Sequence, residues 1–129
     1  MKILLDTNFI LTTAKQKIDF PSLAHEIIEE DIEWLVPQEV LNELGNLKDR
    51  PGMKTLDKEA ACLGFDILCG IKPKPTVIGL KLKHPNIDQG IISYIIDKPI
   101  VLATLDKGLK KQIDNKILTI RGKKRLELI

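Results

Sequence analysis

Residues 1–11 read MKILLDTNFIL, an apolar run that three polar residues interrupt before it resumes. Lys2–Leu5 has the composition of a short buried strand. Asp6, Thr7 and Asn8 are residue types that end strands, because their side chains hydrogen-bond to nearby backbone groups. Asp6 is therefore either a turn residue or a functional carboxylate at the end of a strand, and the rest of the chain decides between the two.

The remaining sequence alternates strand-like apolar runs with amphipathic segments of helical period. Further strands are predicted over 34–36, 76–78, 100–103 and 117–120. Helices are predicted over about 20–30, 38–47, 53–69 and 106–113, with one more after Pro85 and Asn86. Alternation of this kind indicates βαβ units. We expect one α/β domain over residues 1–129, with three αβα layers around a central, mostly parallel sheet.

The composition is that of an ordinary globular domain, because the 129 residues are 43% hydrophobic and 29% charged, with a net charge of +2. Cys62 and Cys69 stand seven residues apart in one predicted helix. About 10 Å then separates their Cα atoms, which is too far for a disulfide. We therefore expect reduced core thiols in a cytoplasmic protein. The opening apolar run is too short for a signal peptide, and no segment has the length of a transmembrane helix.

Four carboxylates occupy comparable places in this pattern. Asp6 and Asp106 each follow an apolar strand, and the carboxyl ends of parallel strands meet at the edge where open α/β sheets bind ligands. Asp88 and Glu43 lie on the apolar faces of predicted helices. Each acid alone has an ordinary explanation as a helix cap, a turn residue or a solvated flank.

Together these acids require another explanation, because no Lys or Arg lies on the same strand edge or apolar faces. Converging carboxylates repel one another unless a divalent ion lies between them. Oxygen ligands without His or Cys favour Mg²⁺ or Mn²⁺ over zinc.

In this order the residues resemble a PIN domain. The resemblance rests on the strand that ends in Asp-Thr-Asn, the Glu within VPQEVLNEL (36–44), the Asp that opens a helix, and Thr-x-Asp after a buried strand. It covers essentially the whole chain. The segments VLATLDKGLKK (101–111) and IRGK (120–123) resemble in particular the PIN nucleases of small-subunit ribosomal RNA maturation and their archaeal relatives.

The resemblance implies a hydrolase that cuts RNA endonucleolytically with Mg²⁺ or Mn²⁺ and acts in ribosomal RNA processing. Its implied acidic site consists of Asp6, Glu43, Asp88 and Asp106. We expect Asp6 and Asp106 to bind the metal directly, with Asp88 as the next ligand. Glu43 is expected to orient water or hold a second ion, and Glu39 replaces it if the helix has a different phase.

Three polar residues, Thr7, Asn8 and Thr104, match family positions that support the carboxylates by hydrogen bonds. One position departs from the family pattern. Gln89 stands where many relatives have a second Asp, so we expect one ion to bind tightly and a second to bind only with substrate.

The region from Lys107 to Arg125 contains many basic residues and one acid, Asp114. Candidate RNA contacts within this basic C-terminal segment (107–125) are Lys107, Lys110, Lys111, Arg121, Lys123 and Lys124. Such a cluster contacts phosphates without reading sequence, and a solvated charged face is the alternative. Aromatic residues make up only 4% of the chain, so base stacking is not expected to dominate, and Trp34 and Tyr94 are expected to pack.

Other functions stay open at this point. A VapC-like toxin ribonuclease requires a small antitoxin, and a non-catalytic PIN module binds only RNA or partners and has no need of four acids. A haloacid-dehalogenase-type phosphatase is disfavoured because Asn8 stands where its Asp-x-Asp motif needs an acid. The expected partners are a ribosomal RNA precursor, preribosomal proteins or a second copy of the chain, and no membrane.

Overall fold

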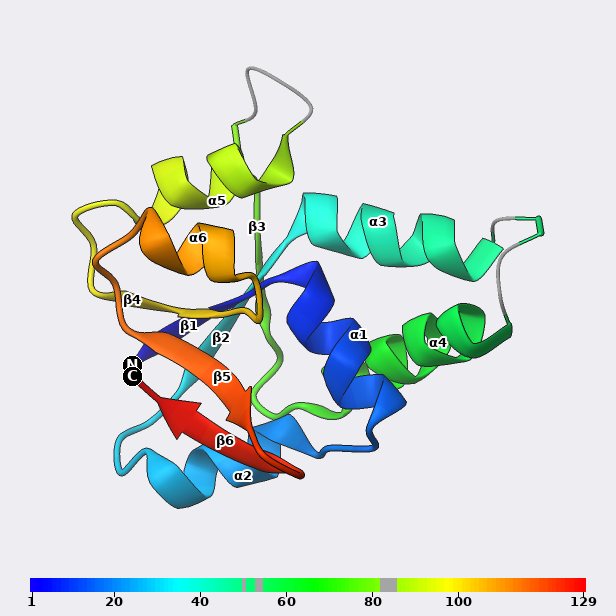
Figure 1. The fold of residues 1–129 in the computed structure, drawn as a ribbon, viewed down its shortest axis with the longest axis horizontal. Helices are drawn as coiled ribbons and strands as arrows, with labels where there is room; N and C mark the ends of the chain where they lie inside the picture. The colour runs from blue at the N-terminus through cyan, green and yellow to red at the C-terminus, as the bar shows by residue number, and fades with distance from the viewer. Residues whose placement is uncertain (50, 53–54, 82–85) are drawn as a thin grey trace.

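The computed structural model describes residues 1–49, 51–52, 55–81 and 86–129. Its sheet has the strand order β3-β2-β1-β4-β5-β6 (Figure 1). The strands are β1 (Lys2–Leu5), β2 (Glu33–Pro37), β3 (Thr76–Ile78), β4 (Ile100–Ala103), β5 (Ile117–Arg121) and β6 (Arg125–Leu128). The helices are α1 (Thr7–Lys15), α2 (Phe20–Ile27), α3 (Gln38–Asp49), α4 (Thr55–Gly70), α5 (Ile87–Ile95) and α6 (Lys107–Lys111).

The first five strands in this sheet order, β3-β2-β1-β4-β5, pair in parallel with their neighbours. The last strand, β6, pairs antiparallel with β5. The predicted α/β class with a mostly parallel sheet is therefore confirmed. The central pair sets the position of the site, because Ile3 is opposite Val101 and Leu5 is opposite Ala103. This register brings the carboxyl ends of β1 and β4 side by side.

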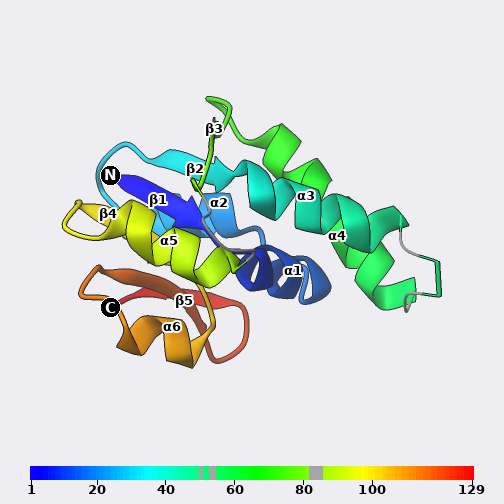
Figure 2. The ribbon, with the colours of Figure 1, turned by 90° about the horizontal axis from the view of Figure 1, so that it is seen from above.

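Alternate residues of each central strand face opposite sides of the sheet, as the pleat requires. Ile3 and Leu5 belong to a buried cluster that α1, α2, α3 and α4 cover. Leu4 and Leu102 belong to a second cluster that α5 and α6 cover. Figure 2 shows α5 over the middle of the sheet, with β3 to one side and α6 to the other. These helices make the two outer layers of the sandwich.

Two elements were not predicted from the sequence. Helix α1 begins directly after Asp6, which accepts a hydrogen bond from the Thr7 backbone N–H as its N-cap, so one residue both ends β1 and starts the helix. Strand β6 turns back along β5, with Gly122 at φ 62° and Lys124 at φ 56° in the turn. A hairpin replaces the expected tail because Leu126 and Leu128 pack against the larger core cluster.

Several boundaries also differ from the sequence prediction. Helix α2 ends at Ile27 rather than near residue 30. Cys62 is half-buried and Cys69 is exposed, so the predicted core position of Cys69 is wrong, while both thiols are free as expected. The predicted helix start at Met53 and the predicted lead-in at Pro85 lie outside the described residues. Within the described parts of the chain, no helix is both long and apolar enough to cross a membrane.

Close packing of α4 on α1 holds the start of α1 in place. A Cβ added at Gly64 of α4 would lie 2.8 Å from Cγ2 of Ile10, a fully buried residue of α1. We therefore expect Gly64→Ala to destabilise the protein by about 1–3 kcal/mol through overpacking, despite alanine's better helix propensity. Gly45→Ala is the matched control, because an added Cβ there meets no atom within 4 Å.

The measurement for both variants is urea denaturation. Gly45→Ala should raise the free energy of unfolding by up to about 1 kcal/mol, the helix propensity gain of alanine over glycine. If Gly64→Ala were stabilised by the same amount, α4 would not pack against α1 at this distance.

Candidate active site

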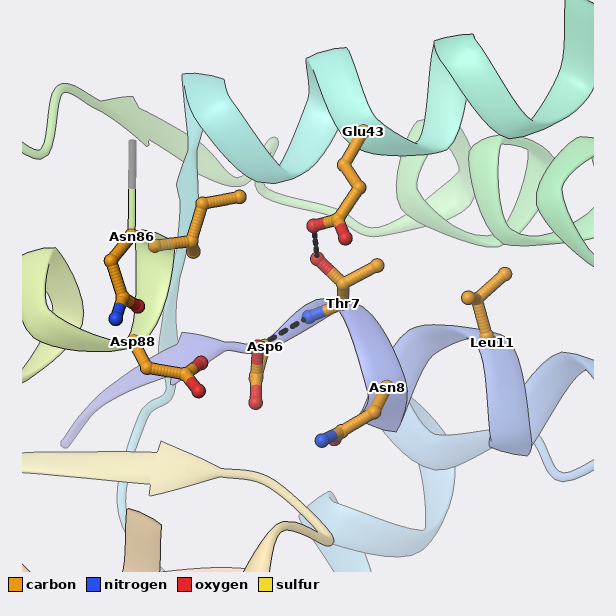
Figure 3. A pocket seen from close by; sticks show the side chains of 8 residues that line it. Asp6, Thr7, Asn8, Leu11, Glu43, Asn86 and Asp88 are labelled. Atoms are coloured by element: carbon orange, nitrogen blue, oxygen red, sulfur yellow. Dashed lines mark hydrogen bonds between the residues drawn. The ribbon is translucent and has the colours of Figure 1, made fainter. Parts of the chain in front are cut away.

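A pocket of about 560 Å³ opens at the carboxyl end of β1 (Figure 3). Its walls come from four elements: the end of β1, the first turns of α1, the middle of α3 and the start of α5. The lining residues are Asp6, Thr7, Asn8, Leu11, Glu43, Asn86, Ile87 and Asp88. The structure therefore brings together the predicted acids Asp6, Glu43 and Asp88, which are far apart in sequence.

Asp6 is the most deeply placed of these acids, with 4% of its surface exposed. Its backbone N–H donates to the Ala103 carbonyl at 3.0 Å, which fixes it beside the end of β4. Its Oδ1 accepts from the Thr7 N–H at 2.8 Å, and its Oδ2 accepts from the Thr104 hydroxyl at 2.8 Å. Each carboxylate oxygen keeps a further lone pair, so the group is held firmly yet can still bind a ligand.

Burial raises the pKa of Asp6 from 3.8 to about 6, and this effect outweighs the two hydrogen bonds that favour the ionised form. The nearby charges of Asp88 and Glu43 contribute less to the same rise in pKa. Asp6 is thus an acid whose negative charge is destabilised in the metal-free protein.

Glu43 is exposed, so its predicted place on the apolar face of α3 is wrong, and it reaches the pocket from the exposed side of the helix, where Thr7 holds it. The Thr7 hydroxyl donates to Glu43 Oε2 at 2.7 Å, while the Thr7 backbone N–H donates to Asp6. One threonine therefore fixes two carboxylates. The alternative acid Glu39 lies elsewhere, since its carboxylate accepts the Leu80 N–H at 3.2 and 3.3 Å and does not line the pocket.

Asp88 is the second residue of α5 and is half-buried. The N-cap of α5 is Asn86, whose Oδ1 faces the Gln89 N–H at 3.4 Å, so Asp88 is not needed for capping. Burial raises the pKa of Asp88, and the negative charges of Asp106 and Glu43 raise it further. Asp88 lies in the first turn of α5, where a negative charge also favours the helix dipole, but its carboxylate makes no hydrogen bond within the described part of the chain.

Asp106 does not line the pocket, in contrast to the other three acids. It is the N-cap of α6, because its Oδ1 accepts the N–H groups of Gly108 at 2.9 Å and Leu109 at 3.2 Å. It lies close enough to Asp88 to raise the pKa of that residue. Asp106 thus combines the ordinary capping role with a position next to the acidic pocket.

Thr104 and Asn8 organise the loop between β4 and α6. The Thr104 hydroxyl donates to Asp6 and accepts the Asp106 N–H at 3.1 Å, so it supports one acid and positions the next. Asn8 behaves differently from what the resemblance implies. Its Oδ1 accepts from the Leu105 N–H at 3.1 Å and from the Thr104 hydroxyl at 3.4 Å, so it supports the loop and not a carboxylate.

Within the described part of the chain, none of the four candidate acids forms an ion pair. The ion pairs found there join Met1 to Glu30, Lys15 to Asp57 and Arg121 to Glu127. Among the described residues, no three acidic, histidine or cysteine side chains already surround one point closely enough to hold an ion.

The predicted RNA-contacting residues divide into two groups on neighbouring elements. Lys107, Lys110 and Lys111 form most of α6, and Lys110 is half-buried with its Nζ donating to the Thr119 hydroxyl at 3.1 Å. The other group surrounds the β5–β6 turn. There Arg121 pairs with Glu127 at 2.6 Å, whereas Lys123 and Lys124 are exposed. Lys110 and Arg121 thus already make polar contacts within the protein.

The sequence analysis missed three pocket residues: Leu11, Asn86 and Ile87. Asn86 could have been found as a favoured N-cap type directly before an amphipathic segment. Leu11 could not, because its place in the pocket depends on the unpredicted helix α1.

Comparison with known proteins places this fold. No curated protein sequence matches the chain. The solved structure of the PIN domain endonuclease Utp24 is similar with a TM-score of 0.75 and 20% identity, covering 98% of this chain and 90% of that chain. VapBC2 from Rickettsia felis, solved bound to a DNA fragment from its promoter, gives a TM-score of 0.61 and 19% identity over 92% of this chain and 98% of that one.

At these identities the two structures show a shared fold and no more. The sequence itself goes further, because the profile of the PIN-like domain matches residues 3–123, which is nearly the whole chain. The chain therefore belongs to the PIN-like domain family.

Proposed function

We propose that this protein is an endoribonuclease that hydrolyses RNA phosphodiester bonds with Mg²⁺ or Mn²⁺ and acts in the cytoplasm on precursors of ribosomal RNA. The observation that carries the proposal is the convergence of Asp6, Glu43 and Asp88 on one pocket without a compensating cation among the described residues. Membership of the PIN-like family supports nuclease chemistry. The resemblance of 101–111 to ribosomal RNA maturation nucleases supports the substrate, and two free cysteines fit a reducing compartment.

The residues present fit a hard divalent ion. All of the candidate ligands are carboxylate oxygens, which Mg²⁺ and Mn²⁺ prefer. Asp6 would hold the ion from the pocket floor, with Asp88 at its side, and Asp106 would contribute Oδ2, because its capping bonds use Oδ1. When bound, such an ion supplies Lewis acidity that lowers the pKa of water and offsets the negative charge of the phosphate.

The chain's own side chains would then position the reactants. Glu43 is the candidate for orienting the attacking water. Thr7 donates to its Oε2, and no described residue donates to its Oε1. Leu11 and Ile87 form apolar walls beside the acids. Thr104 keeps Asp6 and the start of α6 in a fixed relation.

The direct test is cleavage of end-labelled ribosomal RNA fragments with Mg²⁺, Mn²⁺ or EDTA, using wild type and Asp6→Asn. Cutting that needs a metal and is lost in the variant supports the proposal. Cutting that persists in EDTA contradicts it. Absence of cutting under every metal, from folded protein, would favour a module that only binds RNA or partners, and toxicity on expression would favour the VapC-like role.

Asn86 is expected to contribute a substrate contact. Its Oδ1 faces the Gln89 N–H, which leaves the amide N–H₂ as an uncharged donor at the start of α5, in a pocket lined by three carboxylates. A phosphate oxygen needs such a donor. Asn86→Ser keeps a good N-cap but removes the amide, so we expect cleavage to fall by at least about tenfold, as for loss of one transition-state donor.

The matched control is Asn46→Ser, which changes an asparagine of α3 outside the pocket. Initial rates over a range of RNA concentrations give kcat and KM for each variant. If Asn86→Ser cleaved as fast as Asn46→Ser, Asn86 would be a helix cap only.

A further inference from the structure

A second pocket lies against α5, on the side towards β3. It has a volume of about 360 Å³, and we call it the α5–β3 pocket. The lining residues that matter for its chemistry are Gly79, Lys81, Gly90, Ser93, Tyr94 and Lys98. No carboxylate stands among its described lining residues, so its charge is opposite to that of the acidic pocket.

Tyr94 supplies a flat ring that is only half-buried. The ring packs against the smaller core cluster on one side, and the Lys98 Nζ lies over it, 4.6 Å from the ring centroid. Lys98 itself is exposed. An exposed cation–π contact is worth about 0.5–1 kcal/mol, whereas a nucleobase stacked on an aromatic ring is worth about 1–3 kcal/mol. A base can therefore displace the ammonium group from the ring.

The displaced ammonium group would have a use in the same pocket. Lys81 enters from the segment after β3, and Lys98 follows α5, so two cations line the pocket that contains the Tyr94 ring. A nucleotide combines a flat base with an adjacent anionic phosphate, and this pocket offers a partner for each part. Gly79 leaves room for the ligand, since a Cβ added there meets no atom within 4 Å.

Helix geometry relates the α5–β3 pocket to the acidic pocket. Tyr94 follows Asp88 by six residues, which is about 9 Å along the axis of α5. Six residues also turn the helix by about 600°, so the two side chains lie on different flanks. A strand that fills both pockets must cross the outer side of α5.

That outer side suits an RNA strand. Asn86, Gln89 and Ser93 lie three and then four residues apart, so they share this face of α5. All three are exposed and uncharged. None of them repels a phosphate, and each can form hydrogen bonds. A crossing strand would thus meet neutral polar groups between the acidic pocket and the lysines.

We propose that the α5–β3 pocket binds one nucleotide of the RNA strand, several positions from the cut bond because the strand passes around α5, with its base on Tyr94 and its phosphate near Lys81 and Lys98. This inference rests on the proposed endoribonuclease function. It changes the expectation for Tyr94, which packs against the core and also offers a ring to a ligand.

The test uses oligoribonucleotides that are lengthened one nucleotide at a time on each side of the cut bond. With wild type, kcat/KM should rise about tenfold when one particular nucleotide is added, a typical effect of one base–aromatic stack. Tyr94→Phe should keep this rise. Tyr94→Leu retains an apolar side chain for the core but has no ring, so it should lose the rise while cutting the shortest substrate normally.

Two lysine variants complete the set. Lys98→Ala should lower the gain and weaken its salt dependence, because one phosphate contact is lost. Lys2→Ala is the control, since Lys2 is exposed at the amino end of β1, on the opposite sheet edge. Thermal melting of every variant separates loss of fold from loss of contact.

A calorimetric titration with 5′-AMP distinguishes a strand from a free nucleotide. AMP binding that Tyr94→Leu abolishes, without any length-dependent gain, supports the pocket as a site for a free nucleotide. If wild type cuts RNA but Tyr94→Leu shows the same gain and AMP does not bind, the inference is wrong and the proposed function stands. If wild type cuts nothing, oligonucleotide binding by fluorescence anisotropy decides, and equal affinity of wild type and Tyr94→Leu overturns the inference.

Discussion

Asp6→Asn is expected to lower metal-dependent RNA cleavage by more than about 100-fold while leaving the protein at least as stable as the wild type. Activity falls because the amide is a much weaker ligand for a divalent ion than the buried carboxylate. Stability is kept because the pKa of Asp6 is raised to about 6, so the ionised carboxylate is unfavourable in the folded, metal-free protein.

The surrounding hydrogen bonds can accommodate the amide. The amide oxygen can still accept from the Thr7 N–H, which lies 2.8 Å from Asp6 Oδ1 in the wild type. Its N–H₂ group can donate to the Thr104 hydroxyl, which can then turn its proton towards Asn8 Oδ1 at 3.4 Å. The network reverses direction at one bond, so each hydrogen bond that the Asp6 side chain makes has a counterpart in the variant.

The measurements are cleavage rates and thermal melting with and without Mn²⁺. Mn²⁺ should raise the melting temperature of the wild type and not that of Asp6→Asn, since an ion that binds only the folded state stabilises it by mass action. Asp19→Asn is the matched control, because Asp19 caps α2 far from the pocket. A large loss of stability in Asp6→Asn alone would show that Asp6 is a structural cap.

The pH dependence of stability is the second large effect. An acid with a pKa of 3.8 in the unfolded chain and about 6 in the folded one keeps its proton longer in the folded state. The folded chain then binds more protons between these pH values, so its stability falls as pH rises from about 4 to 7. The loss attributable to Asp6 amounts to about 3 kcal/mol and is complete above about pH 7.

Other carboxylates titrate in the same range, so the quantity to measure is a difference. Urea denaturation of metal-free wild type and Asp6→Asn at pH 4, 5, 6 and 7 gives that difference at each pH. It should change by about 3 kcal/mol in favour of the variant as pH rises. A difference that stays constant from pH 4 to pH 7 would contradict a raised pKa for Asp6.

Saturating Mn²⁺ should reduce this pH effect in the wild type. The ion binds the ionised carboxylate, so metal binding favours loss of the Asp6 proton and offsets the cost of the buried charge. At subsaturating Mn²⁺, cleavage should increase as pH rises through about 6, and saturating Mn²⁺ should move this rise to lower pH.

Two simple regularities of the sequence lead to the site. A strand that is buried on both faces is apolar throughout, so 3–5 and 100–103 can be recognised as central strands. In a parallel sheet their carboxyl ends share one edge, and this rule alone puts Asp6 and Asp106 at the same edge. Helical phase then favours Glu43 over Glu39, and Glu43 is the one that lines the pocket.

The two elements that were not predicted from the sequence, α1 and β6, were missed for a common reason. Helix α1 is hard to predict because Asp6 both ends a strand and caps a helix, and no loop residues separate the two elements. Strand β6 is hard to predict because its alternation is short and its preceding turn is strongly basic, like a solvated tail. In each case a local pattern is compatible with two structures, and packing against the core selects one of them.

Local patterns in the chain were enough to establish the fold class, the family and the acids at the carboxyl edge of the sheet, since buried apolar runs and right-handed crossovers constrain where strands end. Three-dimensional packing was needed to establish which acids share a pocket, that Asp106 also caps α6, and that Asn86 and Tyr94 border two pockets of opposite charge. These facts depend on the separation of side chains from different elements. Periodicity along the chain fixes the face on which a residue lies, but not its distance from a residue of another helix.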